Sequence, residues 1–216
     1  MSTVLLVDVD GTLVNSWPGV RQTLEKTFEE IDWPMPSEDV IARLPGPPLG
    51  VTFASYGMSG EYLTHALEVF RHYYTESGWR NSSLFPGWKE VLPQWKAAGY
   101  SINTATSKSI GHTKSIIENL GVRPYFDFLG ASGDDGSRGT KAEVIEYVLE
   151  SQNLDPARDR ILMIGDRSHD IEGAAEFAIP TALVGWGHGN QAEWDSADFF
   201  ARDFKDLERI VRDFAR

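Results

Sequence analysis

Two carboxylates, Asp8 and Asp10, follow a run of aliphatic residues, Val4 to Val7, near the start of the chain. Burying one carboxylate at the end of a strand is costly, and burying two of the same charge costs more. Residues two apart in a strand point to the same side, so both carboxylates reach one crevice if the strand persists to its end. Gly11 then lets the chain turn away. Either this is a solvated turn, or a positive charge is expected beside it.

A second acidic pair, Asp166 and Asp170, follows the apolar run 161–164. If a helix begins near Ser168, Asp170 lies in its first turn, where a carboxylate is favoured, so a helix cap is the simpler interpretation of this residue. Asp166 comes at the strand end itself and in the same layer as Asp8. Three or four carboxylates that converge on one crevice, with oxygen ligands only, are typical of a Mg²⁺ site.

Hydroxyl groups and a lysine complete the pattern. The run 102–108 contains Thr106 and Ser107, which offer hydroxyls and backbone N–H groups at an expected helix start, a natural cradle for phosphate. Further along, the Gly-containing loop 137–141 ends in Lys141, just before a helical pattern. A lysine in the first turn of a helix is disfavoured by the dipole, yet surface lysines occur there. Both a site lysine and a solvated lysine therefore stay open for Lys141.

The elements that must position these side chains alternate between short apolar runs and longer helical patterns. This alternation predicts an α/β protein with a doubly wound, Rossmann-like parallel sheet, in which ligands bind at the carboxyl ends of the strands. The expected strands are residues 4–7, 100–105, 126–131, 161–164, 181–184 and 198–200.

Residues 17–82 break the alternation, because they contain helical patterns and turn-forming Pro and Gly clusters but no convincing strand. A right-handed crossover needs only about a dozen residues beyond the strands. The segment is therefore expected to be an inserted α-helical cap subdomain, and the core domain to comprise residues 1–16 and 83–216. An insertion placed directly after the acidic strand end is expected to cover it as a lid.

Composition excludes several classes of function. The chain has 216 residues, of which 41% are hydrophobic, enough for one large domain or two small ones. Its formal charge of -12 argues against a nucleic acid polymer or an anionic membrane as partner, but not against a phosphorylated small molecule in a local positive pocket. The absence of cysteine excludes disulfides, thiolate metal sites and cysteine nucleophiles. No leader-like segment or membrane-length apolar run is present, so we expect a cytoplasmic protein, as a monomer or homodimer.

The segments DVDGT, ATSK, TKAEVIEYVL and GDRSHDIEGA, in this order, resemble the four motifs of the haloacid dehalogenase-like hydrolase superfamily. The resemblance covers essentially the whole chain, including a helical cap inserted after the first strand. Within the superfamily the chain resembles phosphoglycolate phosphatases and, in Gly46 to Leu49, GTKAEVI and Gly185 to Gly189, the 5′-nucleotidase-like branch. The resemblance implies a Mg²⁺-dependent phosphoric monoester hydrolase that acts on a small-molecule phosphomonoester, such as a nucleoside 5′-monophosphate or 2-phosphoglycolate.

The resemblance also implies a role for each matching residue. Asp8 is expected to be the nucleophile that forms an aspartyl-phosphate, and Asp10 the general acid and base. An Asp with an ordinary pKa near ~3.9 is protonated only about one part in a thousand at pH 7, so the acid role needs a raised pKa or a proton delivered with the substrate. Mg²⁺ is expected to be held by Asp8, the backbone carbonyl of Asp10 and Asp166. Asp170 is expected to support these ligands or to contact the metal through water.

Charge explains why cations are needed beside Asp8. A carboxylate that approaches a phosphate dianion at about 4 Å is opposed by roughly 8 kcal/mol at an effective dielectric constant of about 20. Mg²⁺ is expected to offset most of this repulsion, with Thr106 and Lys141 holding the phosphoryl oxygens and Lys141 paired with Asp8. Ser107 and Arg43 complete the expected substrate-binding set. The alternative for Arg43 is a surface arginine beside a proline-rich turn.

Asp10 also separates reaction classes. The dehalogenases of the superfamily lack an aspartate two residues after the nucleophile, so Asp10 favours phosphoryl transfer over carbon–halogen cleavage. A phosphomutase of the β-phosphoglucomutase type shares the core residues and stays open as an alternative. A non-catalytic phospho-acceptor or binding protein is a further alternative, because receiver domains also place acidic residues and Mg²⁺ at the ends of a parallel sheet. Such domains are usually much shorter and have no inserted helical lid.

Overall fold

The computed structural model describes residues 3–37, 41 and 49–216. The chain divides into two compact units, one formed by Met1–Asn15 with Ser83–Arg216 and the other by Ser16–Ser82. The function of the smaller unit as a lid stays a prediction. Among the described residues, no helix combines the length and the apolar character that a membrane span requires.

In the part of the chain that the structure describes, the larger unit contains a six-stranded parallel sheet, which confirms the predicted α/β class. The strand order is β5-β4-β1-β6-β7-β8. The strands are β1 (Thr3–Val7), β4 (Ser101–Ser109), β5 (Phe128–Ser132), β6 (Arg160–Gly165), β7 (Thr181–Val184) and β8 (Phe199–Ala201). From β1 the chain adds β4 and β5 on one side of the sheet and then β6, β7 and β8 on the other. Ligands of doubly wound sheets bind at this switch point.

Strand β1 is fully buried, because it pairs with β4 on one side and with β6 on the other. This explains its continuous aliphatic sequence. A short antiparallel pair, β2 (Val14–Asn15) with β3 (Ser83–Leu84), lies where the chain leaves the larger unit and returns to it.

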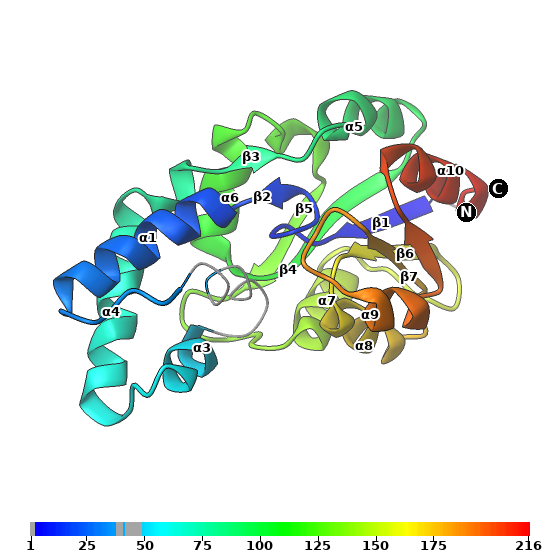
Figure 1. Cartoon of the computed structure of the whole chain (residues 1–216). Helices are drawn as coiled ribbons and strands as arrows, with labels where there is room; N and C mark the ends of the chain where they lie inside the picture. Colours follow the sequence, from blue (N-terminus) through cyan, green and yellow to red (C-terminus); the bar gives the residue numbers. More distant parts are fainter. Residues whose placement is uncertain (1–2, 38–40, 42–48) are drawn as a thin grey trace. The chain divides into compact units, whose positions relative to one another are not determined.

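Helices cover both faces of the sheet, with α7 and α8 on one face and α5 and α10 on the other (Figure 1). The helices of this unit are α5 (Trp88–Ala97), α6 (Ile110–Asn119), α7 (Lys141–Ser151), α8 (Ser168–Ala175), α9 (Gln191–Ser196) and α10 (Phe204–Phe214), with a 3₁₀ turn, η2 (Arg123–Tyr125). Val144 and Val148, one helical turn apart on α7, join Leu6 and Met163 of the sheet in one buried cluster. This cluster fixes α7 against the strands that carry the acidic residues.

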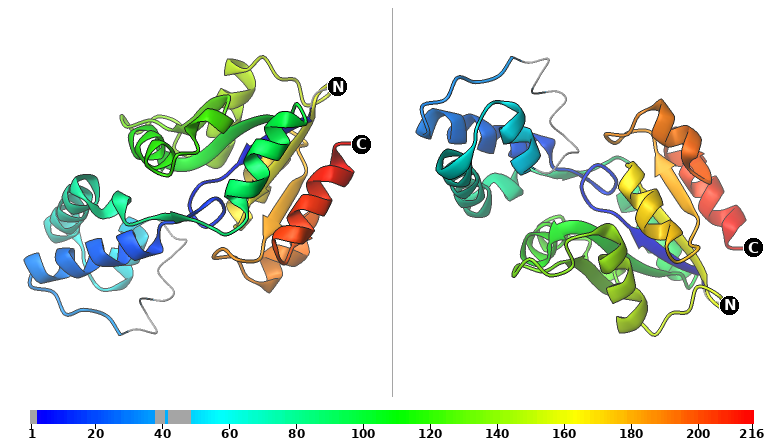
Figure 2. Two further views of the ribbon diagram at one scale, coloured as in Figure 1. Left: turned by 90° about the horizontal axis from the view of Figure 1, so that it is seen from above. Right: turned by 90° about the horizontal axis from the view of Figure 1, so that it is seen from below.

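The smaller unit is helical. It contains α1 (Trp17–Glu30), α3 (Leu49–Ser55), α4 (Gly60–Glu76) and a 3₁₀ turn, η1 (Gly78–Arg80), and no strand among its described residues. Helices α1 and α4 lie side by side (Figure 2) and bury an apolar cluster that includes Phe28 and Phe70. Gly19 and Gly78 allow a close backbone approach, because a Cβ on Gly19 would lie 2.0 Å from the carbonyl oxygen of Gly78.

Candidate active site

Asp8 directly follows β1 and is still hydrogen-bonded to the neighbouring strand, whereas Asp10 lies in the turn beyond. The backbone N–H of Asp8 donates to the carbonyl of Ile164 at 2.9 Å, and the Asp8 residue is only 4% exposed. The chain then turns, and Gly11 adopts a φ of 82°, which glycine reaches without steric cost. The strand therefore ends before Asp10, which lies in the turn. The prediction that Asp8 and Asp10 point to the same side of one strand is wrong.

Lys141 is a buried cation at the start of α7. The helix begins with a capping box, in which the Thr140 hydroxyl accepts the N–H of Glu143 and the Glu143 carboxylate accepts the N–H of Thr140. This cap fixes the first turn and so the position of Lys141. The residue is 4% exposed, which contradicts the solvated interpretation that the sequence left open.

Two carboxylates and one carbonyl surround the ammonium group of Lys141. Its Nζ donates to Asp8 Oδ1 at 2.8 Å and to the carbonyl of Ala105 at 2.8 Å, and lies 2.7 Å from Asp170 Oδ1. The cation is therefore shared between Asp8, directly after β1, and Asp170, in the first turn of α8.

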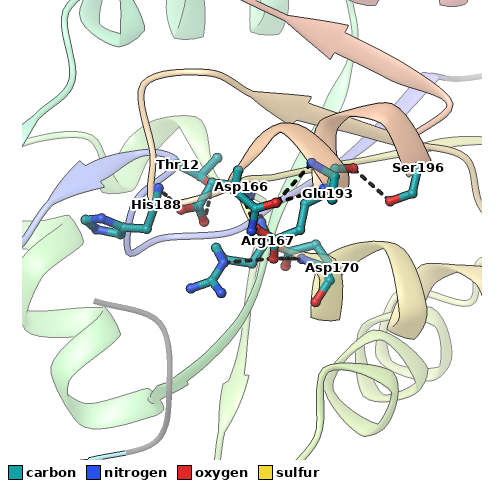
Figure 3. Close-up of polar contacts among 10 residues, drawn as sticks. Thr12, Asp166, Arg167, Asp170, His188, Glu193 and Ser196 are labelled. Carbon is teal, nitrogen blue, oxygen red and sulfur yellow. Dashed lines mark hydrogen bonds and ion pairs between the residues drawn. The ribbon is translucent and has the colours of Figure 1, made fainter. Parts of the chain in front are cut away.

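The acidic cluster consists of Asp8, Asp166 and Asp170, whose nearest carboxylate oxygens lie within 4.8 Å of one another. Asp166 accepts the hydroxyl of Thr12 at 3.3 Å on Oδ1 and the backbone N–H of His188 at 2.7 Å on Oδ2 (Figure 3). Asp170 Oδ2 accepts the backbone N–H of Asp166 at 3.0 Å, so it also fixes the turn before α8. Asp170 therefore caps α8, as predicted, while its role in supporting a metal ligand stays a prediction.

Burial and like charge shift the pKa values of this cluster. Burial raises the pKa of Asp8, and Asp170 adds to the rise, while Lys141 only partly opposes it. Burial, Asp8 and Asp170 raise the pKa of Asp166 to about 8. Burial alone would lower the pKa of Lys141, but the neighbouring charges of Asp170 and Asp8 raise it above its ordinary value. The lysine therefore stays charged.

The cluster fits a divalent cation. Its donors are all carboxylate oxygens, which hard cations such as Mg²⁺ prefer. With Asp8, Asp166 and Asp170 ionised, Lys141 leaves the cluster short of two positive charges, the charge of one such ion. The carboxylate of Asp10 is not a member of this group.

Asp10 has a partner that the sequence did not reveal. Lys108 Nζ donates to Asp10 Oδ2 at 2.8 Å, and the Lys108 side chain is 9% exposed. His112 lies nearby on α6, and burial together with the charge of Lys108 lowers the pKa of its imidazole. The signal for Lys108 was its place in the ATSK segment, two residues after Thr106 on the same strand, β4.

The predicted helix start at Thr106 and Ser107 is wrong. Strand β4 continues to Ser109, because its pairing with β5 resumes there after an irregularity between residues 106 and 109. Such irregularities are common beside active sites, where they redirect side chains. Thr106 is buried and its hydroxyl oxygen accepts the N–H of Lys108 at 3.3 Å, whereas Ser107 is exposed. Arg43 and Gly46 to Pro48 lie outside the described residues.

A second polar network joins the start of α8 to α9. Glu193 is nearly buried, and its carboxylate accepts Arg167 Nε at 3.0 Å and the backbone N–H groups of Ser168 and Asn190 at 2.9 Å each (Figure 3). These donors hold the pKa of Glu193 below its ordinary value although burial opposes the shift. Sequence reasoning missed this network, because its two halves lie more than twenty residues apart.

Fold and site together define a doubly wound α/β protein with an acidic cluster that could hold a metal ion at the switch point of its sheet. Residues 5–184 match the haloacid dehalogenase-like hydrolase family. The chain belongs to this family, as the four motifs predicted.

Relatives in the family carry several names. The chain is 35% identical over 186 residues to the tyrosine-protein kinase PtkA of Mycobacterium tuberculosis (strain ATCC 25618 / H37Rv), covering 86% of this chain and only 63% of that protein. It is 29% identical to a 5′-nucleotidase of Pseudomonas aeruginosa, covering 88% and 85% of the two chains. It is 28% identical to a phosphoglycolate phosphatase of Rhodospirillum rubrum, covering 88% and 83%. The crystal structure of a predicted phosphatase from Clostridium acetobutylicum superposes with a TM-score of 0.87, at 29% identity and 98% coverage of both chains.

Proposed function

We propose that this protein is a Mg²⁺-dependent phosphatase, which hydrolyses small-molecule phosphomonoesters through a phosphoaspartate formed on Asp8. The observation that carries the proposal is the environment of Asp8. Its carboxylate is buried at the end of the central strand, bonded to Lys141 at 2.8 Å and grouped with Asp166 and Asp170. Relatives named 5′-nucleotidase and phosphoglycolate phosphatase support the same chemistry.

In the first proposed step, a carboxylate oxygen of Asp8 attacks phosphorus and the bond to the leaving oxygen breaks. Asp10 gives that oxygen its proton. In the second step, Asp10 takes a proton from water as the water attacks the phosphoaspartate, which releases inorganic phosphate and restores the Asp8 carboxylate. Lys141 holds the orientation of Asp8 throughout, and Lys108 holds that of Asp10 through Oδ2.

The metal would be held by Asp8, Asp166 and the backbone carbonyl of Asp10, with Asp170 in support through Lys141. When bound, Mg²⁺ supplies the positive charge that offsets the repulsion between the Asp8 carboxylate and the phosphoryl group. Thr106 is proposed to hold a phosphoryl oxygen through its hydroxyl. Ser107 and Arg43 stay predictions as substrate-binding residues.

The experiment is hydrolysis of p-nitrophenyl phosphate with Mg²⁺ and with EDTA. Wild type is expected to turn over only with Mg²⁺, and Asp8→Asn to lose turnover while keeping its circular dichroism spectrum. Asp213→Asn, an exposed substitution of the same type on α10, is the matched control and should retain full activity. Absence of metal-dependent turnover in wild type would reject the proposal. More than a few per cent of activity in Asp8→Asn would reject the nucleophile.

For the substrate we propose a nucleoside 5′-monophosphate ahead of 2-phosphoglycolate. A panel of phosphomonoesters ranked by kcat/KM decides between them, and turnover of 2-phosphoglycolate far above every nucleotide would reverse the order. Release of inorganic phosphate separates a phosphatase from a phosphomutase, which would return the phosphoryl group to the substrate. Because one relative is named a tyrosine-protein kinase, the panel includes ATP and phosphotyrosine.

A further inference from the structure

The loop Gly185–Gly189, between β7 and α9, has no part in the proposed reaction, yet one of its backbone N–H groups contacts the acidic cluster directly and one of its side chains contacts Thr12 beside the cluster. The backbone N–H of His188 donates to Asp166 Oδ2 at 2.7 Å. The indole Nε1 of Trp186 donates to the carbonyl of Thr12 at 2.9 Å. Thr12 belongs to the turn after β1, and its hydroxyl donates to the other oxygen of Asp166 at 3.3 Å. The loop Gly185–Gly189 and the turn after β1 thus each donate a hydrogen bond to a different oxygen of Asp166.

The packing around Asp166 leaves no room for a methyl group. A Cβ on Gly187 would lie 2.4 Å from the Cβ of Asp166 and 2.6 Å from the carbonyl oxygen of Gly11. A Cβ on Gly11 would lie 2.3 Å from Asp166 Oδ2 and 2.9 Å from the His188 ring. The loop therefore has to lie directly against the carboxylate, and a displacement of the loop would release it.

Trp186 anchors this loop. Its ring stacks on Phe204 with centroids 5.2 Å apart, and Phe204 also meets the edge of Trp88 at 5.3 Å. The indole N–H of Trp88 donates to the same Thr12 carbonyl at 3.0 Å, so two tryptophans converge on one oxygen. The two tryptophans belong to different elements: Trp186 to the loop that contacts Asp166, and Trp88 to α5.

We propose that Trp186 is a positioning residue of the metal site. By tying the loop to Thr12, it holds the His188 N–H against Asp166, which keeps this carboxylate turned toward Asp8 despite their like charge. Hydrogen-bonding partners behind a ligating carboxylate orient it and strengthen metal binding. The inference rests on the proposed function for the identity of the ion, Mg²⁺, and it links the carboxylate of Asp166 to the turn that carries Asp10.

The test is calorimetric titration of Mg²⁺ into the metal-free full chain without substrate, comparing Trp186→Phe with Trp88→Phe. Both variants delete one indole N–H from the Thr12 carbonyl, keep an aromatic ring and leave the other donor in place. Trp186→Phe is expected to raise the Mg²⁺ dissociation constant roughly tenfold, and Trp88→Phe by less than about twofold. An unchanged constant in Trp186→Phe, or equal shifts in both variants, overturns the proposal, because a general stabilising role would affect both.

A second pair of variants keeps the test decisive if a tryptophan variant fails to fold. Gly187→Ala pushes the loop off Asp166 and should weaken Mg²⁺ binding at least as much as Trp186→Phe. Gly185→Ala is the matched control in the same loop, because its Cβ would meet Phe200 and Arg202 instead, and it should stay within about twofold of wild type. Equal constants for the two alanine variants overturn the proposal.

The two hypotheses fail separately. If wild type binds Mg²⁺, Trp186→Phe binds it more weakly and no phosphomonoester is hydrolysed, the positioning role stands and the phosphatase fails. If wild type hydrolyses p-nitrophenyl phosphate with Mg²⁺ but Trp186→Phe binds the ion as wild type does, the phosphatase stands and the positioning role fails.

Discussion

Replacing Lys141 by Met is the perturbation that tests most directly how the acidic cluster is held in the fold. The substitution keeps a long unbranched side chain but removes the charge between Asp8 and Asp170, whose nearest oxygens lie within 4.8 Å of each other. At that separation and an effective dielectric constant of about 20, two carboxylates repel each other by about 3.5 kcal/mol. Removing one partner of a buried ion pair costs about 3–5 kcal/mol in proteins. We therefore expect Lys141→Met to lower the free energy of unfolding by roughly 3–5 kcal/mol in EDTA at pH 7.

The assay is urea unfolding in EDTA and in Mg²⁺. The control is Lys96→Met, because Lys96 pairs with Asp127 at 2.7 Å in a partly exposed site. An exposed pair contributes at most about 1 kcal/mol, so this control should lose little stability. In Mg²⁺ the difference between Lys141→Met and wild type should narrow, because a bound divalent cation replaces the missing charge.

The pH dependence has a definite sign. The pKa of Asp8 is already raised in the folded protein, so its contribution to stability is full below its unfolded pKa and is lost as the pH rises through the folded value. Without Lys141 this loss should deepen, and the difference between variant and wild type should grow with pH. The reasoning is refuted if Lys141→Met lies within about 1 kcal/mol of wild type in EDTA at pH 7, since a buried pair is expected to cost at least three times as much.

Three further predictions concern the remaining groups. Asp10→Asn should abolish turnover of p-nitrophenyl phosphate nearly as fully as Asp8→Asn while still binding Mg²⁺ by calorimetry; retention of more than a few per cent of activity would contradict the proton-transfer role. Lys108→Met should lower kcat by about tenfold or more by releasing the Asp10 carboxylate, and an unchanged kcat would show that Lys108 does not position it. The Lys96 ammonium and the Ile102 N–H hold the pKa of Asp127 below its ordinary value, although burial opposes them, so its contribution is present above the unfolded pKa and lost as the pH falls through the folded value. Asp127→Asn should therefore be less stable than wild type in urea at pH 7 and equal to it in strong acid; a constant difference at all pH values would contradict this assignment.

Local patterns were sufficient for most of the sheet. Strand 181–184 was predicted with its observed bounds, which lie between Pro180 and Gly185. The aliphatic run of β1 identified a strand buried on both faces. Strand β4 was predicted too short, since its last residues are polar and become a strand only through pairing with β5, a partner more than twenty residues away.

The sequence predicted which residues gather at the site, but not the burial and hydrogen bonds that hold them there. Asp8, Asp166 and Asp170 could be grouped from the sequence because each follows or caps an element whose end lies at the same edge of the sheet. The burial of Lys141 could not be predicted, because it depends on the packing of α7 against β4. The hydrogen bond from Trp186 to Thr12 crosses 174 positions of sequence, and a tryptophan in a glycine-rich loop gives no signal of it.

The charge of the cluster depends both on local sequence patterns and on contacts between residues far apart in the chain. The carboxylates are local features of the sequence, and when all three are ionised they bring three negative charges into a buried site. The positive charge that compensates these carboxylates comes from a distant part of the sequence, Lys141 at the start of α7. The orientation of Asp166 likewise depends on distant segments, the loop after β7 and the turn after β1. The fold therefore supplies one of the three positive charges that the cluster needs and leaves two to a ligand. In the metal-free protein the raised pKa values of Asp8 and Asp166 reduce this deficit by protonation. The ionised cluster favours a divalent cation over a monovalent one, which ties the stability of this part of the fold to the ion that its chemistry is proposed to use.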